Sequence, residues 1–185
     1  MEGDTSSDIV SIHNTASYVS FIRSTKNAAI RNLNFTEGSL SGLNVGGIVG
    51  YLNNGYVLNC TNANSLTGVH YTAGIVCYVY DEGAILGCVN LGQIVSSQNY
   101  ATGNYASGIV GCNNNQYTLD IYVVGCINYG YVDGQYTAGI SKNSWNWRIY
   151  GCFSMCGGNG WNLVTSATYT VTFIGCVRLN NEQFE

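Results

Sequence analysis

Apolar residues return along this chain at a long and nearly constant interval, each time inside the same short phrase. The phrase first reads Gly46-Gly47-Ile48-Val49-Gly50, and it returns as Ala73-Gly74-Ile75-Val76, Ser107-Gly108-Ile109-Val110-Gly111 and Ala138-Gly139-Ile140. Each copy is followed by a turn, an apolar strand that leads to a Cys, a short bend and a further apolar strand. Because a repeating phrase indicates a repeating structural unit, one copy describes one turn of a solenoid.

Three columns of equivalent residues appear when the repeats are aligned. The first column holds Leu33 followed by five cysteines, Cys60, Cys88, Cys126, Cys152 and Cys176, at spacings of 27, 28, 38, 26 and 24 residues. The second holds the repeat glycines Gly47, Gly74, Gly108 and Gly139. The third is apolar and holds Leu40, Leu66, Ile94, Val132 and Leu163. A turn therefore takes about 27 residues, with insertions before Gly108 and before Val123.

This pattern predicts an all-β chain, a right-handed parallel β-helix of about six coils over residues 30–185. Three short strands per turn, each bounded by Gly or Asn, are typical of a three-sided β-solenoid. The right hand follows from the preference of parallel crossover connections. A β-sandwich is disfavoured, because antiparallel hairpins do not explain why one position resembles the position a full repeat later. The density of Gly, Asn and β-branched residues disfavours helices within the repeat.

Residues 1–29 precede the repeat and are expected to form a cap segment. Asn14-Thr15 can cap a short helix over Ala16 to Arg23 that has one apolar face. Such a cap would shield the core and the backbone edge at the end of the solenoid. The alternative is a degenerate first coil.

Two polar columns predict how each turn bends. The residue before the Cys column is Asn32, Asn59, Gly87, Gly125, Gly151 or Gly175. Asn and Gly accept a left-handed backbone most readily, so we expect a corner there. Two residues after the Cys stand Asn62, Asn90 and Asn128, which predict a structural Asn ladder whose side-chain amides bond from coil to coil. Ser154 and Arg178 interrupt this column in the last turns.

The repeat resembles a known family. The segment Ile85-Leu86-Gly87-Cys88-Val89-Asn90-Leu91-Gly92-Gln93-Ile94, followed by Tyr105-Ala106-Ser107-Gly108-Ile109-Val110-Gly111, is similar to the GLUG repeat of β-helical stretches in large bacterial surface and secreted proteins. The turn from Val123 to Ile140 matches too, and the resemblance covers roughly Ile30 to Gly151. It implies a β-helix within a larger surface protein. It supplies no catalytic residues, because structural glycines and core aliphatic residues define the family.

Charge is sparse. Charged residues make up 9% of the chain, with six Lys and Arg against ten Asp and Glu and no basic run, which predicts no nucleic-acid partner. No apolar run approaches the roughly 20 residues that a membrane span needs. The start, Met1 to Asp8, is acidic and polar, unlike a signal peptide. The chain therefore either stays inside the cell or is a piece of a longer protein, and the resemblance to GLUG repeats implies an extracellular or cell-surface location as part of such a protein.

The five cysteines of the first column are expected to form a reduced, buried stack of small apolar fillers. Neighbours in the column lie about one strand spacing apart, roughly 4.8 Å, but their side chains point the same way, which disfavours a disulfide. Cys152 and Cys156 leave a bridge or half a metal site open as alternatives. No second pair has zinc-like spacing, and neither His13 nor His70 is near them in sequence, so we predict no metal and no cofactor.

Tyrosines are the candidate binding residues. Tyr71, Tyr105 and Tyr136 share one column, three residues before the repeat glycine. An exposed row of rings beside Asn amides suits sugars, whose C–H faces lie on aromatic rings while their hydroxyls find amide partners. The alternative is a tyrosine ladder that packs against itself.

These observations favour a non-catalytic binding or adhesion module that presents a rigid face to a glycan or to a cell-surface protein. One alternative is a structural spacer or filament subunit, which would self-associate end to end. Another is a polysaccharide lyase or hydrolase that uses carboxylates on neighbouring coils, Asp81, Glu82 and Asp120, as general acid and base.

Overall fold

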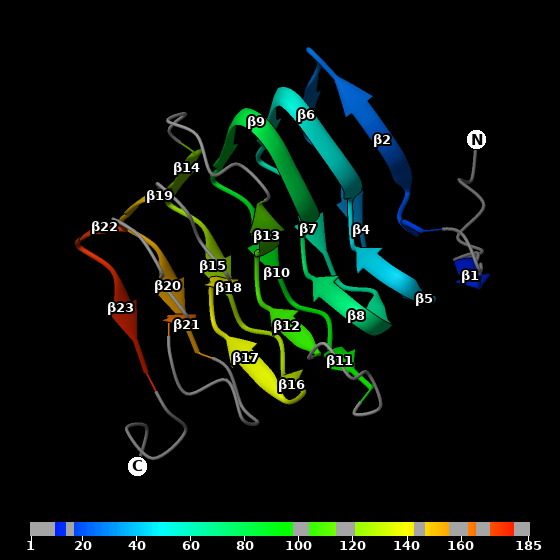
Figure 1. Cartoon of the computed structure of the whole chain (residues 1–185). Helices are drawn as coiled ribbons and strands as arrows, with labels where there is room; N and C mark the ends of the chain where they lie inside the picture. Colours follow the sequence, from blue (N-terminus) through cyan, green and yellow to red (C-terminus); the bar gives the residue numbers. More distant parts are fainter. Residues whose placement is uncertain are drawn as a thin grey trace, which may run out of the picture.

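The computed structural model describes residues 10–13, 17–97, 104–113, 121–142, 147–155, 163–165 and 171–179. These residues form 23 strands and no helix, and every pairing between strands is parallel. The fold is the predicted β-solenoid. Strands of successive turns lie side by side along its axis, from β1 near one end to β23 at the other (Figure 1).

The strands belong to three sheets. Sheet A contains β1 (Val10–His13), β5 (Gly38–Gly46), β8 (Ser65–Ala73), β11 (Ile94–Ser96), β12 (Tyr105–Ser107), β16 (Val132–Asp133) and β17 (Tyr136–Ala138). Sheet B contains β2 (Ile22–Lys26), β3 (Ala29–Arg31), β6 (Val49–Leu58), β9 (Val76–Leu86), β13 (Val110–Asn113), β14 (Ile121–Val124), β18 (Ser141–Lys142), β19 (Trp147–Tyr150), β21 (Val164–Thr165) and β22 (Thr172–Ile174). Sheet C contains β4 (Asn34–Phe35), β7 (Thr61–Asn62), β10 (Val89–Asn90), β15 (Ile127–Asn128), β20 (Phe153–Ser154) and β23 (Val177–Arg178).

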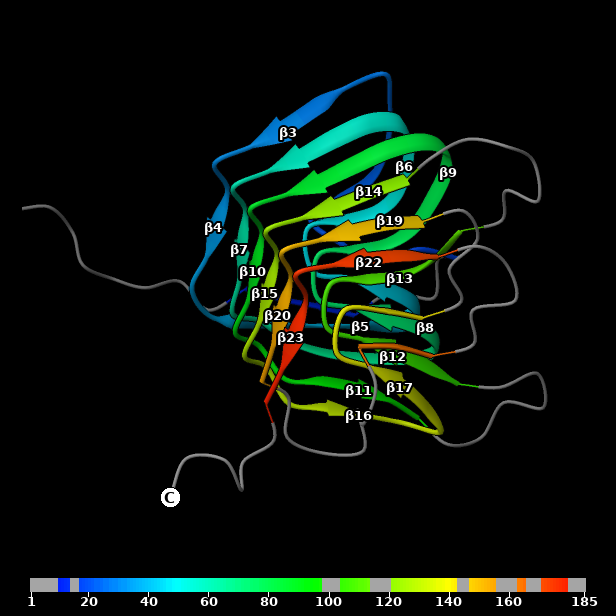
Figure 2. The same ribbon diagram turned by 90° about the vertical axis from the view of Figure 1, so that its left-hand side faces the viewer.

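Figure 2 looks along the solenoid from its C-terminal end and shows its hand. The chain runs leftward through β19, down through β20 and then rightward, so it winds anticlockwise as it approaches the viewer, which is a right-handed coil. Six strands stack in sheet C. The chain thus makes about five turns, one fewer than the repeat count predicts.

The helix predicted over Ala16 to Arg23 is wrong. Within the described part of that segment, Val19 bridges Val45 in parallel and β2 begins at Ile22, in register with β6. Val19 is 3% exposed, so its burial in the core outweighs the local helical pattern. The degenerate first coil, stated above as the alternative, describes this segment, and parallel pairing already includes residues before 30.

The left-handed corner before the Cys column is confirmed. Its φ angles lie between 49° and 64° at Asn32, Asn59, Gly87, Gly125, Gly151 and Gly175. A second left-handed position, at Asn27, Asn54 and Asp81, was not predicted; it bends sheet B where the register between β6 and β9 shifts. Leu163 also differs from expectation, because it accepts a hydrogen bond from Ile140 and so continues the column of Ile140 rather than that of Val132.

The repeat glycines lie where two parts of the chain meet inside the molecule. A Cβ added to Gly74 would touch the carbonyl oxygen of Gly108 and the side-chain amide of Asn90 from sheet C, and Gly47 and Gly108 have equivalent neighbours. The turn between sheets A and B is thus folded inward toward sheet C, as the connection from β17 to β18 shows (Figure 2). It separates a large core cluster under sheets B and C from a smaller one along sheet A, which includes Leu40, Leu66, Ile94 and Val132.

Candidate functional sites

The Asn column forms a continuous interior ladder. Asn62 donates from Nδ2 to Oδ1 of Asn90 at 2.9 Å, and Asn90 donates to Asn128 at 2.8 Å. Asn128 in turn donates to the hydroxyl of Ser154 at 3.5 Å. All four side chains are fully buried, and each Asn also donates to the carbonyl two residues later. Because a buried amide without partners is costly, this ladder depends on all of its members.

The predicted Cys column lies beside the ladder, inside the same core. Cys60, Cys88, Cys126 and Cys152 are buried and Cys176 is half-buried, and none of the seven described cysteines is in a disulfide. The thiol of Cys126 lies 3.4 Å from the carbonyl of Ile85 in the preceding turn. Hydrogen bonds with the neighbouring thiols, together with burial, hold the pKa of Cys126 well above its ordinary value. Cys156 lies outside the described residues.

Tyr71, Tyr105 and Tyr136 are brought together as a stack. Ring centroids of Tyr71 and Tyr105 are 5.0 Å apart with 14° between the planes, and those of Tyr105 and Tyr136 are 5.4 Å apart with 26°. Tyr136 is 42% exposed and the other two are half-buried. The rings therefore cover one another's faces, and what this column offers to solvent is chiefly ring edges and the side of Tyr136.

A lysine that was not predicted packs against this stack. Nζ of Lys142, from β18 of sheet B, lies 4.9 Å from the ring centre of Tyr105 and 5.1 Å from that of Tyr136, both in sheet A. Lys142 is 3% exposed, and burial lowers its pKa to about 8. The ammonium is held by the negative ring faces across the inward fold between the two sheets. Burial likewise lowers the pKa of His70, whose ring lies 4.0 Å from that of Tyr71.

The predicted carboxylates are only partly placed. Asp81 occupies a left-handed position in β9 with φ of 61°, and Glu82 next to it is exposed. Asp120 lies outside the described residues, so the predicted approach of Asp120 to Asp81 and Glu82 stays a prediction. Among the residues that the structure describes, no three His, Cys, Asp or Glu side chains gather as a metal site would require.

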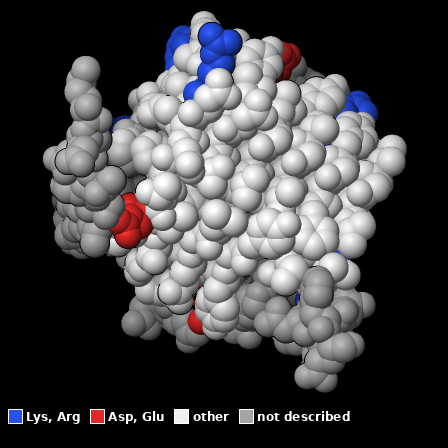
Figure 3. Space-filling view, turned by 180° about the vertical axis from the view of Figure 1, so that it is seen from behind, with Lys and Arg blue, Asp and Glu red and all other residues white. Residues whose placement is uncertain are grey.

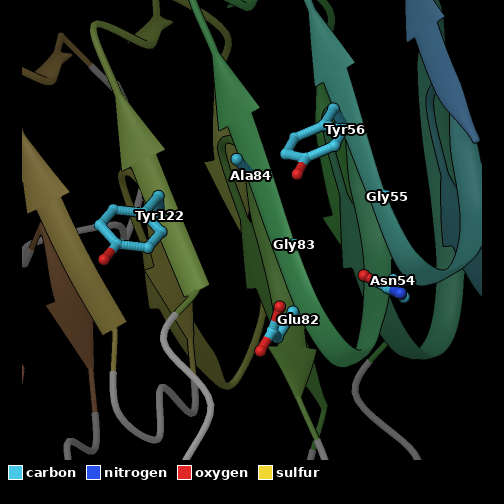
Figure 4. Close-up of a pocket in the computed structure, with 7 residues that line it drawn as sticks. All are labelled: Asn54, Gly55, Tyr56, Glu82, Gly83, Ala84 and Tyr122. Atoms are coloured by element: carbon cyan, nitrogen blue, oxygen red, sulfur yellow. The ribbon is translucent and has the colours of Figure 1, made fainter. Parts of the chain in front are cut away.

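A shallow hollow on the outer face of sheet B was not predicted. It has a volume of about 120 Å³ and is lined by Asn54, Gly55, Tyr56, Glu82, Gly83, Ala84 and Tyr122. Tyr56 and Tyr122 lie on either side of Ala84, while Asn54 and Glu82 lie together at one end (Figure 4). Tyr56 is 54% exposed and Tyr122 is 39% exposed. The sequence signal was a column that alternates between Ala and Tyr, at Ala29, Tyr56, Ala84 and Tyr122.

Comparison with known proteins adds no identification: no family model, curated protein or solved structure matches the chain. In the part of the chain that the structure describes, there is no helix long and apolar enough to cross a membrane.

Proposed function

We propose that this chain is a non-catalytic β-solenoid binding module that presents a rigid face to a glycan. The observation that carries the proposal is the hollow on sheet B with an exposed tyrosine on each side. The resemblance to GLUG repeats supports an adhesion role within a larger bacterial surface protein. Sugar rings bind through their C–H faces to aromatic rings and through their hydroxyls to polar side chains, and the hollow offers both kinds of group.

The spacing of the two tyrosines suits an extended sugar chain. Their strands, β6 and β14, are separated by β9 alone, so the side chains originate roughly 9.6 Å apart. That distance is close to the length of a disaccharide. Between them, Gly55, Gly83 and Ala84 leave space over the sheet. Because each ring is attached to a strand that is paired on both sides, little ordering entropy would be lost on binding.

The polar groups at one end of the hollow favour binding over cleavage. Asn54 donates to Asn27 at 2.9 Å, which holds its amide in place, and Glu82 can accept hydrogen bonds from sugar hydroxyls. Glu82 is the one carboxylate among the residues that line the hollow. Glycoside hydrolysis generally uses a pair of carboxylates, so this lining supports a non-catalytic module.

The stack of Tyr71, Tyr105 and Tyr136 is the second candidate surface for the same function. Its ring faces are largely occupied by neighbouring rings, so we expect it to contribute less than the hollow. A sugar could still contact Tyr136, whose side chain is the most exposed of the three.

Glycan binding by the parent and by a Tyr56→Ala, Tyr122→Ala double variant tests the proposal. A glycan array should identify ligands for the parent, and titration calorimetry on the best ligand should show a loss of about tenfold in affinity per ring. Tyr131→Ala is the matched control, because Tyr131 is 43% exposed but lies away from the hollow. Identical arrays for parent and double variant would refute the site. Release of reducing ends over time would refute the non-catalytic assignment.

A further inference from the structure

The outer side of sheet C carries apolar residues in four successive turns. One outward column holds Val89, Ile127, Phe153 and Val177, which are paired in register. The next holds Leu91, Tyr129, Met155 and Leu179, whose amides donate to equivalent carbonyls of the preceding turn. Leu91, Tyr129 and Val177 are 50%, 49% and 48% exposed. These eight residues are called the sheet C face below.

The same two columns are polar or small in the first turns. Asn34 and Thr61 precede Val89 in the first column, and Ala63 precedes Leu91 in the second. In Figure 3, which views the molecule from the side of sheet C, the charged side chains lie toward the margins of a broad uncharged area. None of the eight residues of the sheet C face is charged. The apolar character is therefore confined to particular turns and does not follow from the fold itself.

The corner that borders this face changes residue at the same turn. Asn32 and Asn59 hold it in the first two turns, and Gly87, Gly125, Gly151 and Gly175 hold it afterwards, with φ angles in one narrow range. Asn adopts this left-handed conformation at positions 32 and 59, so the bend itself does not require Gly in the later turns. A Cβ on Gly125 or Gly151 would meet nothing within 4 Å. Gly125 and Gly151 thus leave the border of the apolar face without side chains where there is space for them.

We infer that the sheet C face is the contact between two copies of this chain, packed face to face about a two-fold axis. Soluble proteins rarely leave a contiguous apolar area of this kind open to water. The face is about 20 Å along the axis and roughly 15 Å across, a flat footprint of about 300 Å² per copy. Two such faces, with their side-chain relief and rims, bury on the order of 1,000 Å², which is the threshold for a biological interface and suits a weak dimer. The apolar residues beyond the corner, Leu86, Val124, Tyr150 and Ile174, supply one rim.

A second copy fits this face better than a glycan or a charged protein. Aliphatic side chains give sugar hydroxyls no hydrogen-bond partners, and a charged partner would be desolvated without compensation. The matching surface must be uncharged and corrugated at one strand spacing, roughly 4.8 Å, and every copy of this chain presents such a surface. Aligned packing of two sheets through alternating side chains is a common arrangement in β-proteins.

Sedimentation equilibrium of the parent and three variants tests the dimer. The parent is expected to dimerise with a dissociation constant of about 1–100 µM, as suits an interface of this size. Ile127→Lys, at the centre of the face, should weaken the dimer by about a hundredfold or more, because the charge occurs twice and is desolvated. Thr61→Lys is the matched control from the same column in a polar turn and should dimerise like the parent. Gly125→Asn keeps the left-handed corner and should weaken the dimer by several-fold.

Circular dichroism and thermal unfolding establish that each variant is folded, and Gly125→Asn keeps the test decisive if Ile127→Lys does not fold. A parent that stays monomeric well above 100 µM overturns the inference. Equal effects of Ile127→Lys and Thr61→Lys also overturn it. A monomeric parent that co-sediments with phosphatidylcholine vesicles would assign the face to a lipid surface instead. Ile127 and Thr61 lie in sheet C, whereas Tyr56 and Tyr122 lie in sheet B, so the effect of Ile127→Lys on the dimer can be separated from glycan binding.

Discussion

Some columns inside the solenoid keep one residue type over several successive turns, whereas the outward columns beside them change. Sheet C shows both behaviours in strands of two residues. The inward residue is Asn62, Asn90 and Asn128 in successive turns, while the outward residue one position earlier is Thr61, Val89 and Ile127. The two columns share backbone, spacing and register, so the difference arises from their surroundings alone.

Residue types repeat in the interior because side chains at equivalent positions of successive turns contact one another directly. Asn90 accepts from the amide of Asn62 and donates to that of Asn128, and the carbonyl of the glycine in the next turn leaves no room for a Cβ at a repeat glycine. The exterior has no such requirement, because an outward side chain does not depend on an identical partner in the next turn and water can hydrogen-bond to the polar ones. Variation on the outside is therefore informative about contacts beyond the chain, and constancy on the inside is informative about the fold.

Substitution of Asn90 should show the largest effect. Asn90→Leu removes three side-chain hydrogen bonds, those with Asn62, Asn128 and the Gly92 carbonyl, and leaves each of these buried groups with one partner fewer, so we expect a loss of about 3–5 kcal/mol. Chemical denaturation measures the change. Asn34→Ala, on the exposed side of the same sheet, should change stability by less than about 0.5 kcal/mol. Similar losses for both variants would remove the distinction between inside and outside.

Gly74→Ala should follow closely. Its Cβ would press on the carbonyl of Gly108 and on the Asn90 amide, neither of which can move without breaking the ladder, and we expect a loss of about 2–4 kcal/mol. Gly125→Ala is the external counterpart, with open space around the added Cβ and only the cost of a left-handed backbone, about 1 kcal/mol. The melting temperatures of the two variants compare the steric cost at Gly74 with the backbone cost at Gly125. Equal shifts would contradict it.

Lys142 places a charge in an otherwise interior position, and its effect should depend on pH. Its pKa in the folded chain, about 8, lies below the ordinary value of 10.5, so between these values the unfolded chain binds a proton that the folded chain has released. Stability due to this group therefore rises with pH from about 8 to about 10.5 and is lowest below that window. The full span corresponds to about 3 kcal/mol.

Comparison with Lys142→Met isolates this term, since the buried Cys77 and Tyr71, whose raised pKa values lower stability at alkaline pH, are present in both proteins. The variant should be the more stable below pH 8, and the difference should shrink as the pH rises toward 10.5. A difference that is independent of pH would show that burial of the ammonium costs nothing.

Val89→Thr should show the smallest effect. The substitution gives outward position 89 the same residue type that position 61 has one turn earlier. We therefore expect the free energy of unfolding of the monomer to change by no more than about 0.5 kcal/mol. Denaturation at low protein concentration keeps the dimer from contributing. A loss comparable to that of Asn90→Leu would mean that the outer columns are as constrained as the inner ones.

The sequence predicted the interior well and the exterior poorly, for the same reason. Few residue types adopt the left-handed corner, and the ladder requires side chains that both donate and accept hydrogen bonds. The same residue types therefore recur in the sequence at the interval of one turn. The Tyr71 column was predicted in register, but its ring stacking depends on side-chain rotation that spacing does not specify. The hollow beside Tyr56 was not predicted, because it arises where the small side chain of Ala84 lies between two tyrosines of neighbouring turns. Such a contrast becomes visible only when the register of the three strands is known. The cap helix failed because pairing of Ile22 with Val49 outweighs local preference.

The Asn ladder also gives the solenoid a direction. Every amide in it donates toward the C-terminal end, so the side-chain dipoles align, with the amide Nδ2 of Asn64 and the hydroxyl of Ser154 completing the two ends. Aligned dipoles polarise one another, which makes the ladder stronger than separate bonds. The step from Asn90 to Asn128 spans 38 residues where the previous step spans 28, yet the bond is as short. The additional 10 residues (38 minus 28) therefore leave the register of the ladder unchanged.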